Sequence, residues 1–561
     1  KPRWLKIEGN VFPRSSSFSE VAMALLLLFG ALLQSTRAGH DVVAAKPYPP
    51  KVPPEPIPDL LEPQAGIFSA RLSFGPRGDP SIMGLTFETP NNTFRKLPKY
   101  VPSVWWAKTL EGLRSGQCQT ARCTSSVKRS CYTESPIAHY CNMTGLEANT
   151  VYFYTIGDAA VGLTSPSTDF SFKTPPPLGS KGPLRTTAVV YGDMGLDYSE
   201  NTRALLAKLA KQDAFDFVIH NGDISYADNR INSRTKPGVA PSIYNDWMDL
   251  FYANISAYSR RIPYMLAPGN HEYPCNYGEY EARAAMMPFR GSNSSDMQYY
   301  SYTVGQTHVV SLSGEDRRLS SLGSTEMKWL EMDLRAAAAA RDRGEVTFII
   351  THVHYPNVPS GYCSSKMSYC CANGNVGLRS SPEGTEHFSA VYGGEAKSDD
   401  CVDHFMTPLN KQVEDMFVRY GVDVHITAHQ HVYERTSPVY RYVAYGNGSN
   451  PLPIGNDGSV FVNPKYPINL NNGNPGNVEL QDVWMPRPRW SVGLRTNADG
   501  SGGTTANNYA DFGFVKLTMD TGRSKGYMNS LNMQYISSRN GRTLDSFTIY
   551  KDSKESTNII V

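Results

Sequence analysis

The chain has 561 residues and a net charge of +2, with 54 Lys and Arg against 52 Asp and Glu. This length predicts two or more domains. The near-neutral balance excludes the polybasic surface that nucleic-acid binding needs, and it gives no general field that would attract anions. An anionic substrate would therefore have to be held by local charge.

An apolar segment at residues 21–33 follows a polar N-terminal stretch that contains several basic residues. The segment is too short to span a bilayer, but it fits the apolar part of a secretory signal, with cleavage after Ala38. We therefore expect residues 1–45 to be a signal-peptide region and the mature chain to have no stable membrane span. A buried helix or a signal anchor is the alternative, and Met23 is an alternative start of translation.

The cysteines and the glycosylation sequons also favour a secreted protein. None of the nine cysteines lies in a CxxC pair, which argues against zinc ribbons and favours disulfides with at least one cysteine left over. The pairing cannot be derived. Sequons for N-glycosylation occur at Asn91, Asn142, Asn254, Asn293 and Asn447. We expect a secreted, extracellular glycoprotein, with a vacuolar or lysosomal-type compartment as the alternative.

Residues 46–64 are dense in proline, which predicts an extended linker. From 65 to 177 short apolar segments alternate with turn signals, and this spacing predicts a small all-β sandwich. Strands are expected at 69–74, 82–88, 101–107, 139–143 and 151–156. This region has no cluster of acids or histidines, so we expect it to be structural.

A second linker, residues 175–183, marks the expected domain boundary. Beyond it, at 183–552, apolar strands alternate with helical stretches, which is typical of α/β layers. Helices are expected at 201–211, 324–341 and 409–420, and strands at 187–191, 215–220, 264–267, 346–351 and 422–427. A late strand pair is expected from 512–517 and 547–550.

Five of these apolar strands are followed by residues that can bind metal ions. They are Gly192-Asp193-Met194-Gly195, Gly222-Asp223 with Tyr226, Gly269-Asn270-His271-Glu272, His352 and His354, and Ala428-His429-Gln430-His431. Each segment alone is commonly a turn or a packing motif. Together and in order they indicate two cations held side by side by Asp, Asn and His. The sequence contains no GxSxG motif and no P-loop.

At these five segments the chain resembles the purple acid phosphatases, which are calcineurin-like metallophosphoesterases, in their larger plant-type form. The family blocks GDxG, GDxxY, GNH[DE], His before x-Pro and GHxH correspond to them in order, and the flanking SYAD and AHQHVYER match as well. The resemblance covers most of 65–550. It implies a fibronectin type III-like domain at 65–177 and an α/β metallophosphoesterase domain, with β-sandwich sheets flanked by helices, at 183–552.

The resemblance also implies a binuclear metal centre. A ferric ion would be bound by Asp193, Tyr226 and His431, and a divalent ion (Zn, Mn or Fe(II)) by Asn270, His354 and His429, with Asp223 bridging both. Hard anionic donors suit a trivalent ion and neutral donors suit a divalent one, which agrees with this division. His271 would contact the phosphate or protonate the leaving group, and His387 is the candidate for a second substrate-contacting histidine.

Two positions of the match leave questions open. His352 stays an alternative to His354, because residues two apart on a strand point to the same face. We choose His354 since it precedes Tyr355 and Pro356 as the family's ligand precedes x-Pro. Ala428 stands where the family has glycine, and alanine lacks glycine's access to positive φ. The remaining histidines that we expect to be packing or surface residues are His220, His308, His404 and His425.

The sequence thus predicts a secreted acid phosphatase that hydrolyses phosphate monoesters, best at acidic pH. Two metals about 3.5–4 Å apart clamp the phosphoryl group and lower the pKa of a bound water, and the resulting hydroxide attacks phosphorus in line. The expected partner is a phosphorylated small molecule and not a nucleic acid; the oligomeric state, including a homodimer, stays open.

The alternatives are the same site acting on phytate, phosphodiesters or nucleotide sugars, and an inactive surface-binding homologue. The second is disfavoured because all the ligand positions are filled.

Overall fold

The computed structural model describes residues 68–89, 101–126, 137–160, 170–180, 182–230, 241–274, 277–289, 292–294, 297–313, 325–356, 387–389, 395–397, 408–441, 443–445, 459–479, 491–495, 512–522 and 528–552. All of them lie in one compact unit, Val52–Val561. The predicted signal region, the proline-rich linker, the sequons at Asn91 and Asn447, and His404 lie outside the described residues. Among the helices that are described, none is long and apolar enough to cross a membrane.

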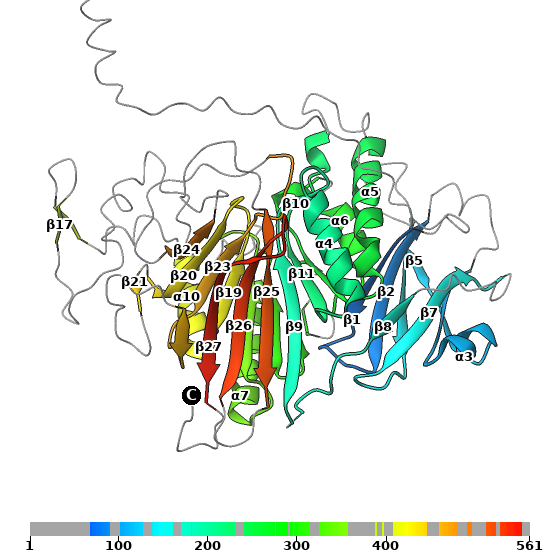
Figure 1. Ribbon diagram of the computed structural model, residues 1–561, viewed down its shortest axis with the longest axis horizontal. Coiled ribbons are helices and arrows are strands. Elements are labelled where there is room, and N and C mark those ends of the chain that lie inside the picture. The colour runs from blue at the N-terminus through cyan, green and yellow to red at the C-terminus, as the bar shows by residue number, and fades with distance from the viewer. Residues whose placement is uncertain are drawn as a thin grey trace, which may run out of the picture. The chain divides into compact units, whose positions relative to one another are not determined.

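Two four-stranded antiparallel sheets form the N-terminal part of the structure (Figure 1). One has the order β1 (Phe68–Phe74), β2 (Ile82–Thr89), β6 (Ile137–Thr144), β5 (Thr124–Ser126); the other has β4 (Gln119–Arg122), β3 (Pro102–Ala107), β7 (Val151–Asp158), β8 (Ser171–Lys173). A short helix, α3 (Leu110–Arg114), follows β3. Leu72, Leu85, Trp106 and Tyr154 share one buried cluster, so the two sheets pack around a common core. All five predicted strands are present.

The C-terminal part contains two larger sheets. The seven-stranded sheet runs β13 (Tyr264–Ala267), β11 (Phe217–Asn221), β9 (Leu184–Tyr191), β25 (Gly513–Thr521), β26 (Asn529–Ser537), β27 (Thr543–Lys551), β22 (Val460–Val462). The eight-stranded sheet runs β14 (Tyr300–Val304), β15 (Thr307–Ser311), β16 (Phe348–His352), β19 (Val424–Thr427), β23 (Ile468–Asn472), β20 (Tyr433–Tyr440), β21 (Val443–Ala444), with β24 (Ser491–Arg495) on β20. Val190, Val218, Ile426 and Leu470 belong to one buried cluster, so these two sheets also pack together.

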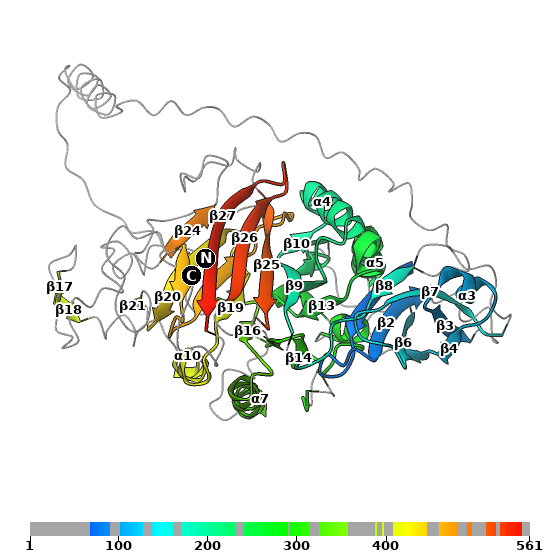
Figure 2. The same cartoon turned by 60° about the horizontal axis from the view of Figure 1, so that its bottom comes forward.

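Helices cover each of the two larger sheets. On the seven-stranded sheet lie α4 (Glu200–Lys211) and α5 (Pro241–Ser259), whose residues Leu206 and Met248 enter its core. Against the eight-stranded sheet lie α7 (Thr325–Asp342) and α10 (Pro408–Tyr420), side by side in Figure 2, with Leu330 and Phe417 in a second core. The sequence therefore predicted the α/β layers correctly.

The predicted late strand pair is wrong in its pairing. Both strands exist, as β25 and β27, but β26 lies between them and pairs with each. In β26 the buried Leu531, Met533 and Tyr535 alternate with polar residues. This period of two is typical of a strand, but the many polar residues hid it in the sequence.

A buried ion network joins the N-terminal sheets to α5 and α6 (Gly278–Arg283). Arg71 of β1 lies 2.8 Å from Glu88 of β2, and Arg283 lies 3.8 Å from the same glutamate. Arg283 also pairs with Glu279 at 2.6 Å and Asp249 at 2.9 Å. Since the charges are paired across these elements, the network fixes the N-terminal sheets against the helices.

The sequons within the described residues differ in the exposure of their asparagine. Asn142 and Asn293 are exposed. Asn254 is buried, where it donates to the Leu250 carbonyl at 2.8 Å and accepts from Arg203 at 2.5 Å. A glycan at Asn254 would displace these hydrogen bonds, so of the three described sequons Asn142 and Asn293 are the accessible ones. Cys123 and Cys141 form a disulfide, and Cys118 has no disulfide partner among the described residues.

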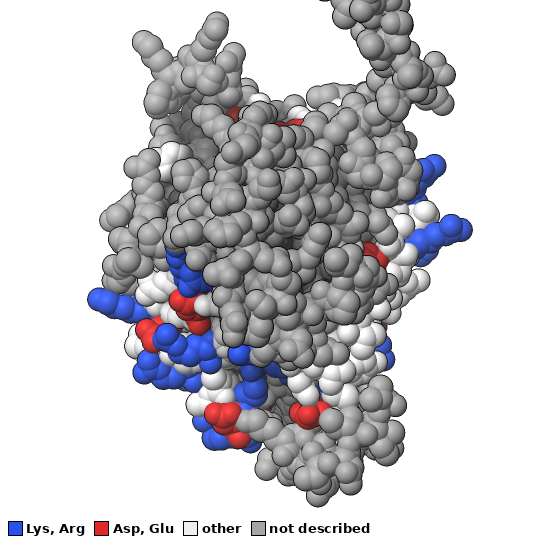
Figure 3. Space-filling model, turned by 90° about the vertical axis from the view of Figure 1, so that its left-hand side faces the viewer, with Lys and Arg blue, Asp and Glu red and all other residues white. Residues whose placement is uncertain are grey.

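Charged side chains of both signs occur together on the face shown in Figure 3, as the near-neutral composition predicts. Oppositely charged side chains also pair between neighbouring helices, such as Arg419 of α10 with Glu331 of α7 at 3.6 Å. An anion would therefore have to be attracted by a local site.

Candidate metal centre

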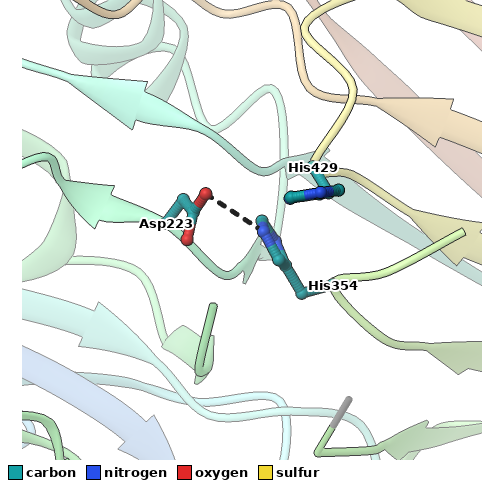
Figure 4. Close-up of side chains that lie close together, drawn as sticks. All are labelled: Asp223, His354 and His429. Carbon is teal, nitrogen blue, oxygen red and sulfur yellow. Dashed lines mark ion pairs between the residues drawn. The ribbon is translucent and has the colours of Figure 1, made fainter. Parts of the chain in front are cut away.

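The candidate ligands gather where parallel strands end. β13, β11 and β9 run parallel, as do β15, β16, β19 and β23, so their carboxyl ends share one edge of each sheet. Asp223, His354 and His429 meet there, with one ligand atom from each lying within 4.8 Å of the others (Figure 4). They come from three loops that are far apart in the sequence.

Asp223 is the carboxylate at the middle of this group. Its Oδ2 lies 3.1 Å from Nε2 of His354, the pair drawn with a dashed line in Figure 4, and its Oδ1 accepts the His271 backbone N–H at 2.9 Å. Burial alone would raise the pKa of Asp223, but the neighbouring His354 and His271 outweigh it and hold the pKa well below its usual value. Asp223 is thus an anion that can bind a cation.

His354 is oriented to offer its Nε2 to the site. Its Nδ1 lies 3.0 Å from the Asn221 carbonyl oxygen, which can only accept, so Nδ1 carries the proton. Nε2 faces Asp223 and, at 3.3 Å, the Oδ1 of Asn270; a proton on Nε2 is donated to these acceptors and would leave when Nε2 binds a cation. A histidine held in this way by a backbone carbonyl is typical of a metal ligand.

A second group of donors adjoins the first. Tyr226 lies with its hydroxyl 3.1 Å from Asp193 Oδ1 and 2.8 Å from His431 Nε2. Asp193 Oδ1 is 3.6 Å from His431 Nε2 and 3.9 Å from His354 Nε2, so it connects the two groups. Burial, with Asp193 and Asp223 close by, raises the pKa of Tyr226 far above its ordinary value. Its phenol would ionise only beside a strongly charged cation.

Four of the candidate ligands have backbone in the left-handed region, with φ of +58° at Asp193, +52° at Asp223, +55° at Tyr226 and +68° at His429. Each such residue costs on the order of 1 kcal/mol or more, and such strain concentrates at functional sites. Hydrogen bonds hold the conformation: for example, the His429 N–H donates to Asp193 Oδ2 at 2.8 Å. The fold thus maintains strain where the ligands meet.

The donor set fits two cations. Two buried carboxylates, a buried phenol, an amide and three imidazoles converge, and the ion pairs of Asp193 and Asp223 among the described residues are with histidines. Carboxylate and phenolate oxygens favour a hard ion, and the imidazoles suit a borderline divalent one.

The structure brings His354 into this group and leaves His352 out. His352 lies at the end of β16 with Nδ1 3.0 Å from Asn221 Oδ1. Burial lowers its pKa to about 3, so it is a neutral packing residue. β16 ends at His352, so His354 is no longer part of the strand. The two side chains therefore do not share the strand face that the sequence had suggested.

Ala428 causes no backbone strain, because the left-handed residue of this segment is His429. Ala428 is fully buried, and its methyl group packs against Gly192. A Cβ added to Gly192 would lie 2.3 Å from the Cβ of Ala428. Glycine at 192 and alanine at 428 are therefore complementary, and the departure from the family pattern is accommodated.

His271 lies beside Asp223 and is surrounded by three carboxylates. Its Nδ1 is 2.7 Å from Asp228 Oδ1, and its Nε2 is 3.7 Å from Asp223 Oδ2 and 3.6 Å from Glu479 Oε1. Burial lowers the pKa of His271, but Asp228 and the other carboxylates outweigh it, so the pKa is raised. The ring can hold a proton close to the candidate ligands.

Three residues of this site escaped the sequence analysis as functional candidates. Glu272 is fully buried and accepts backbone N–H groups from Gly269 at 2.8 Å, Asp223 at 3.0 Å and Ile224 at 2.7 Å, so it fixes two ligand loops. Asp228 and Glu479 flank His271. Asp228 belongs to the SYAD flank and could have been found there, whereas Glu479 follows a glycine- and asparagine-rich stretch without a signal of its own.

The other predicted histidines that the structure describes are not part of the ligand group, although the buried His220 lies near Asp223 and His354. His387 is in β17 (His387–Ser389), which pairs with β18 (Glu395–Lys397), and its side chain lies outside what the structure describes. The histidines expected to be packing residues contact neighbouring hydroxyls: His220 with Tyr264, His308 with Thr303 and His425 with Thr351.

The chain is similar to known phosphoesterases. Residues 186–433 match the family model described as calcineurin-like phosphoesterase. The chain is 28% identical over 372 residues to acid phosphatase type 7 of zebrafish (Danio rerio), covering 65% of this chain and 68% of that one. It is 25% identical over 342 residues to purple acid phosphatase 15 of Arabidopsis thaliana, covering 58% and 54%.

A purple acid phosphatase from yellow lupin (Lupinus luteus) seeds has a similar fold, with a TM-score of 0.62 at 20% identity, over 87% of this chain and 75% of that one. Residues 186–433 are therefore a calcineurin-like phosphoesterase domain, and the chain is a homologue of the acid phosphatases and purple acid phosphatases.

Proposed function

We propose that this protein is a binuclear-metal acid phosphatase that hydrolyses phosphate monoesters. The observation that carries the proposal is the convergence of Asp223, His354 and His429 within 4.8 Å, beside the Asp193–Tyr226–His431 group. The names of its homologues support the same reaction.

The residues divide into two coordination spheres. Asp193, Tyr226 and His431 would hold Fe(III), because they include the hard anionic donors, and Asn270, His354 and His429 would hold Zn, Mn or Fe(II). Asp223 would bridge the two, since it lies next to both groups. When bound, such a metal pair polarises the phosphoryl oxygens and lowers the pKa of a coordinated water.

His271 would supply the proton to the leaving group. Asp228 holds its Nδ1 at 2.7 Å, which leaves Nε2 directed toward Asp223 and the phosphate position. The raised pKa keeps a proton on the ring in mildly acidic solution, so the residue can act as a general acid there. This matches the expected acidic optimum.

The finer sequence predictions stay proposals. They are a fibronectin type III-like character for the sheets at 65–177, domain bounds at 177 and 183, secretion after removal of a signal peptide, glycosylation at exposed sequons, and His387 as a substrate contact. The two packed four-stranded sheets, the Cys123–Cys141 disulfide and the exposed Asn142 and Asn293 support them. Phytate, phosphodiesters or nucleotide sugars remain the alternative substrates, and an inactive surface-binding homologue the alternative protein.

The test compares Asp223→Asn with Asp213→Asn. Both aspartates have φ of +52°, but Asp213 is exposed and remote from the ligands. Asparagine tolerates this backbone conformation, so both variants should fold. Asp223→Asn should lose at least about a hundredfold in kcat/KM on p-nitrophenyl phosphate and bind less metal by elemental analysis, whereas Asp213→Asn should match the wild type. Full turnover by Asp223→Asn would contradict the two-metal scheme.

A further inference from the structure

Glu479 stands at the end of a segment that is fixed to the metal-binding loops. Residues 472–479 follow β23, and Asn477 donates to the Asp193 carbonyl at 2.9 Å. The Gly195 N–H donates to the Gly476 carbonyl at 3.0 Å, and an added Cβ on Gly473 would lie 2.4 Å from Asp193 Oδ2. This segment therefore holds Glu479 at a defined place on the wall of the site.

The side chain of Glu479 is held but remains accessible. Its Oε1 accepts from Asn229 Nδ2 at 2.8 Å, and its backbone N–H donates to Asn477 Oδ1 at 2.9 Å. Its exposed fraction is 42%, against 1% for Asp223 and 25% for Asp228. Of the three carboxylates around His271, Glu479 is the one that a bound molecule can reach most easily.

Its position relative to His271 decides what it would contact. The Nε2 of His271 lies 3.7 Å from Asp223 Oδ2 and 3.6 Å from Glu479 Oε1. If His271 protonates the leaving oxygen, as the proposed function requires, the phosphate lies on the Asp223 side of that nitrogen. The first carbons of the leaving group then lie close to this nitrogen, where the carboxylate of Glu479 can interact with them.

We propose that Glu479 selects the leaving group by charge, so that this phosphatase favours monoesters whose alcohol carries an ammonium group. A carboxylate at this distance attracts a cation and repels an anion. Esters whose alcohol carries further negative charge, such as phytate and nucleotides, are then disfavoured. This inference rests on the proposed phosphatase function and narrows its substrate class.

The experiment uses three phosphate esters of nearly equal size: 2-aminoethyl phosphate, propyl phosphate and 2-carboxyethyl phosphate. The full-length, metal-loaded protein is assayed at pH 6, with p-nitrophenyl phosphate as the reference for activity. The wild type should have a kcat/KM about tenfold higher for the ammonium ester than for the carboxylate ester, since partly exposed charges interact modestly.

In Glu479→Gln this ratio should fall to about one, because glutamine keeps the shape and can still accept from Asn229 but carries no charge. Since Glu479 also acts on His271, kcat/KM for each charged ester is divided by that for propyl phosphate in the same variant, which removes any loss common to all three esters. Glu331→Gln is the matched control: Glu331 is 37% exposed on α7, and its variant should keep the wild-type ratio. Calorimetry with 2-aminoethylphosphonate and 2-carboxyethylphosphonate gives a readout without turnover, and the ratio of their Kd values should change in the same way.

The other outcomes would overturn either the charge selection by Glu479 or the proposed phosphatase function. An equal loss on all three esters, with the ratio unchanged, would overturn the proposal and make Glu479 a positioning residue for His271. A wild type that hydrolyses p-nitrophenyl phosphate but shows no charge preference would also overturn it while leaving the phosphatase function intact. A wild type that hydrolyses none of the four esters would overturn the proposed function itself.

Discussion

Gly222 packs directly against the imidazole of His354: an added Cβ on Gly222 would lie 2.6 Å from Nδ1 and 2.8 Å from the Pro268 carbonyl oxygen. The φ of Gly222 is +86°, a conformation that side chains disfavour. Gly222→Ala should therefore displace His354 and lower metal content and kcat/KM by at least about tenfold, as judged by elemental analysis and p-nitrophenyl phosphate turnover.

Gly344→Ala is the control for that variant. Gly344 has φ of +77°, but nothing lies within 4 Å of an added Cβ. An alanine at position 344 would have the same backbone strain, of about 1 kcal/mol, but would not touch a candidate metal ligand. The variant should lose some thermal stability and keep its metal, and equal metal loss in both variants would refute the packing argument.

Tyr226→Phe tests the assignment of the iron ligand. A phenolate bound to Fe(III) would give a visible charge-transfer band, and the variant should lose this band while Asp193 and His431 retain part of the metal. The buried partners of the hydroxyl also lose a hydrogen bond each, so the free energy of unfolding should fall by about 1–3 kcal/mol. Absorption spectroscopy checks the first effect. A colourless wild type with full activity would argue against iron.

Arg71→Met tests the ion network between the N-terminal sheets and the helices. The variant leaves Glu88, which is 1% exposed, without its closest cation. Removing one partner of a buried pair should lower the free energy of unfolding by about 3 kcal/mol, measured from urea denaturation. Arg343→Met is the control, since Arg343 and Glu345 form an exposed pair, and it should change the urea midpoint little. Similar midpoints for the two variants would contradict a stabilising network.

Glu414 of α10 should make the protein more stable in acid. Burial raises its pKa to about 8, and the charge of Asp415 adds to the rise. The Arg441 backbone N–H at 3.1 Å and the Arg441 guanidinium lower the pKa but do not reverse the rise. In the unfolded chain the pKa returns to about 4.3. The folded state thus binds the proton more tightly, so this contribution is complete below about pH 4 and is lost as pH rises to about 8.

Thermal unfolding at pH 5 and pH 8 checks this dependence. The wild type should lose more stability between the two values than Glu414→Gln, whose amide does not titrate. A variant with the same or a larger loss would show that another group causes the dependence.

Much of the site could be predicted from local sequence. An apolar strand followed at once by potential metal-binding residues is a short-range pattern, and five such patterns in order predicted the candidate ligands, of which the structure brings Asp223, His354 and His429 together. The α/β layers followed from hydrophobic periodicity in the same way. The strand β26 was missed because its apolar residues are spread among polar ones.

Tertiary structure decided the rest, because these features depend on residues distant in the sequence. His354 and not His352 joins Asp223, since the chain leaves β16 between them. Ala428 is accommodated because Gly192 lies opposite it. The carboxylate of Glu479 reaches His271 across 208 positions of the chain (479 − 271) only because the 472–479 segment is tied to the Asp193 loop. The sequence by itself determined which chemical groups are present, and the fold determined which of them meet.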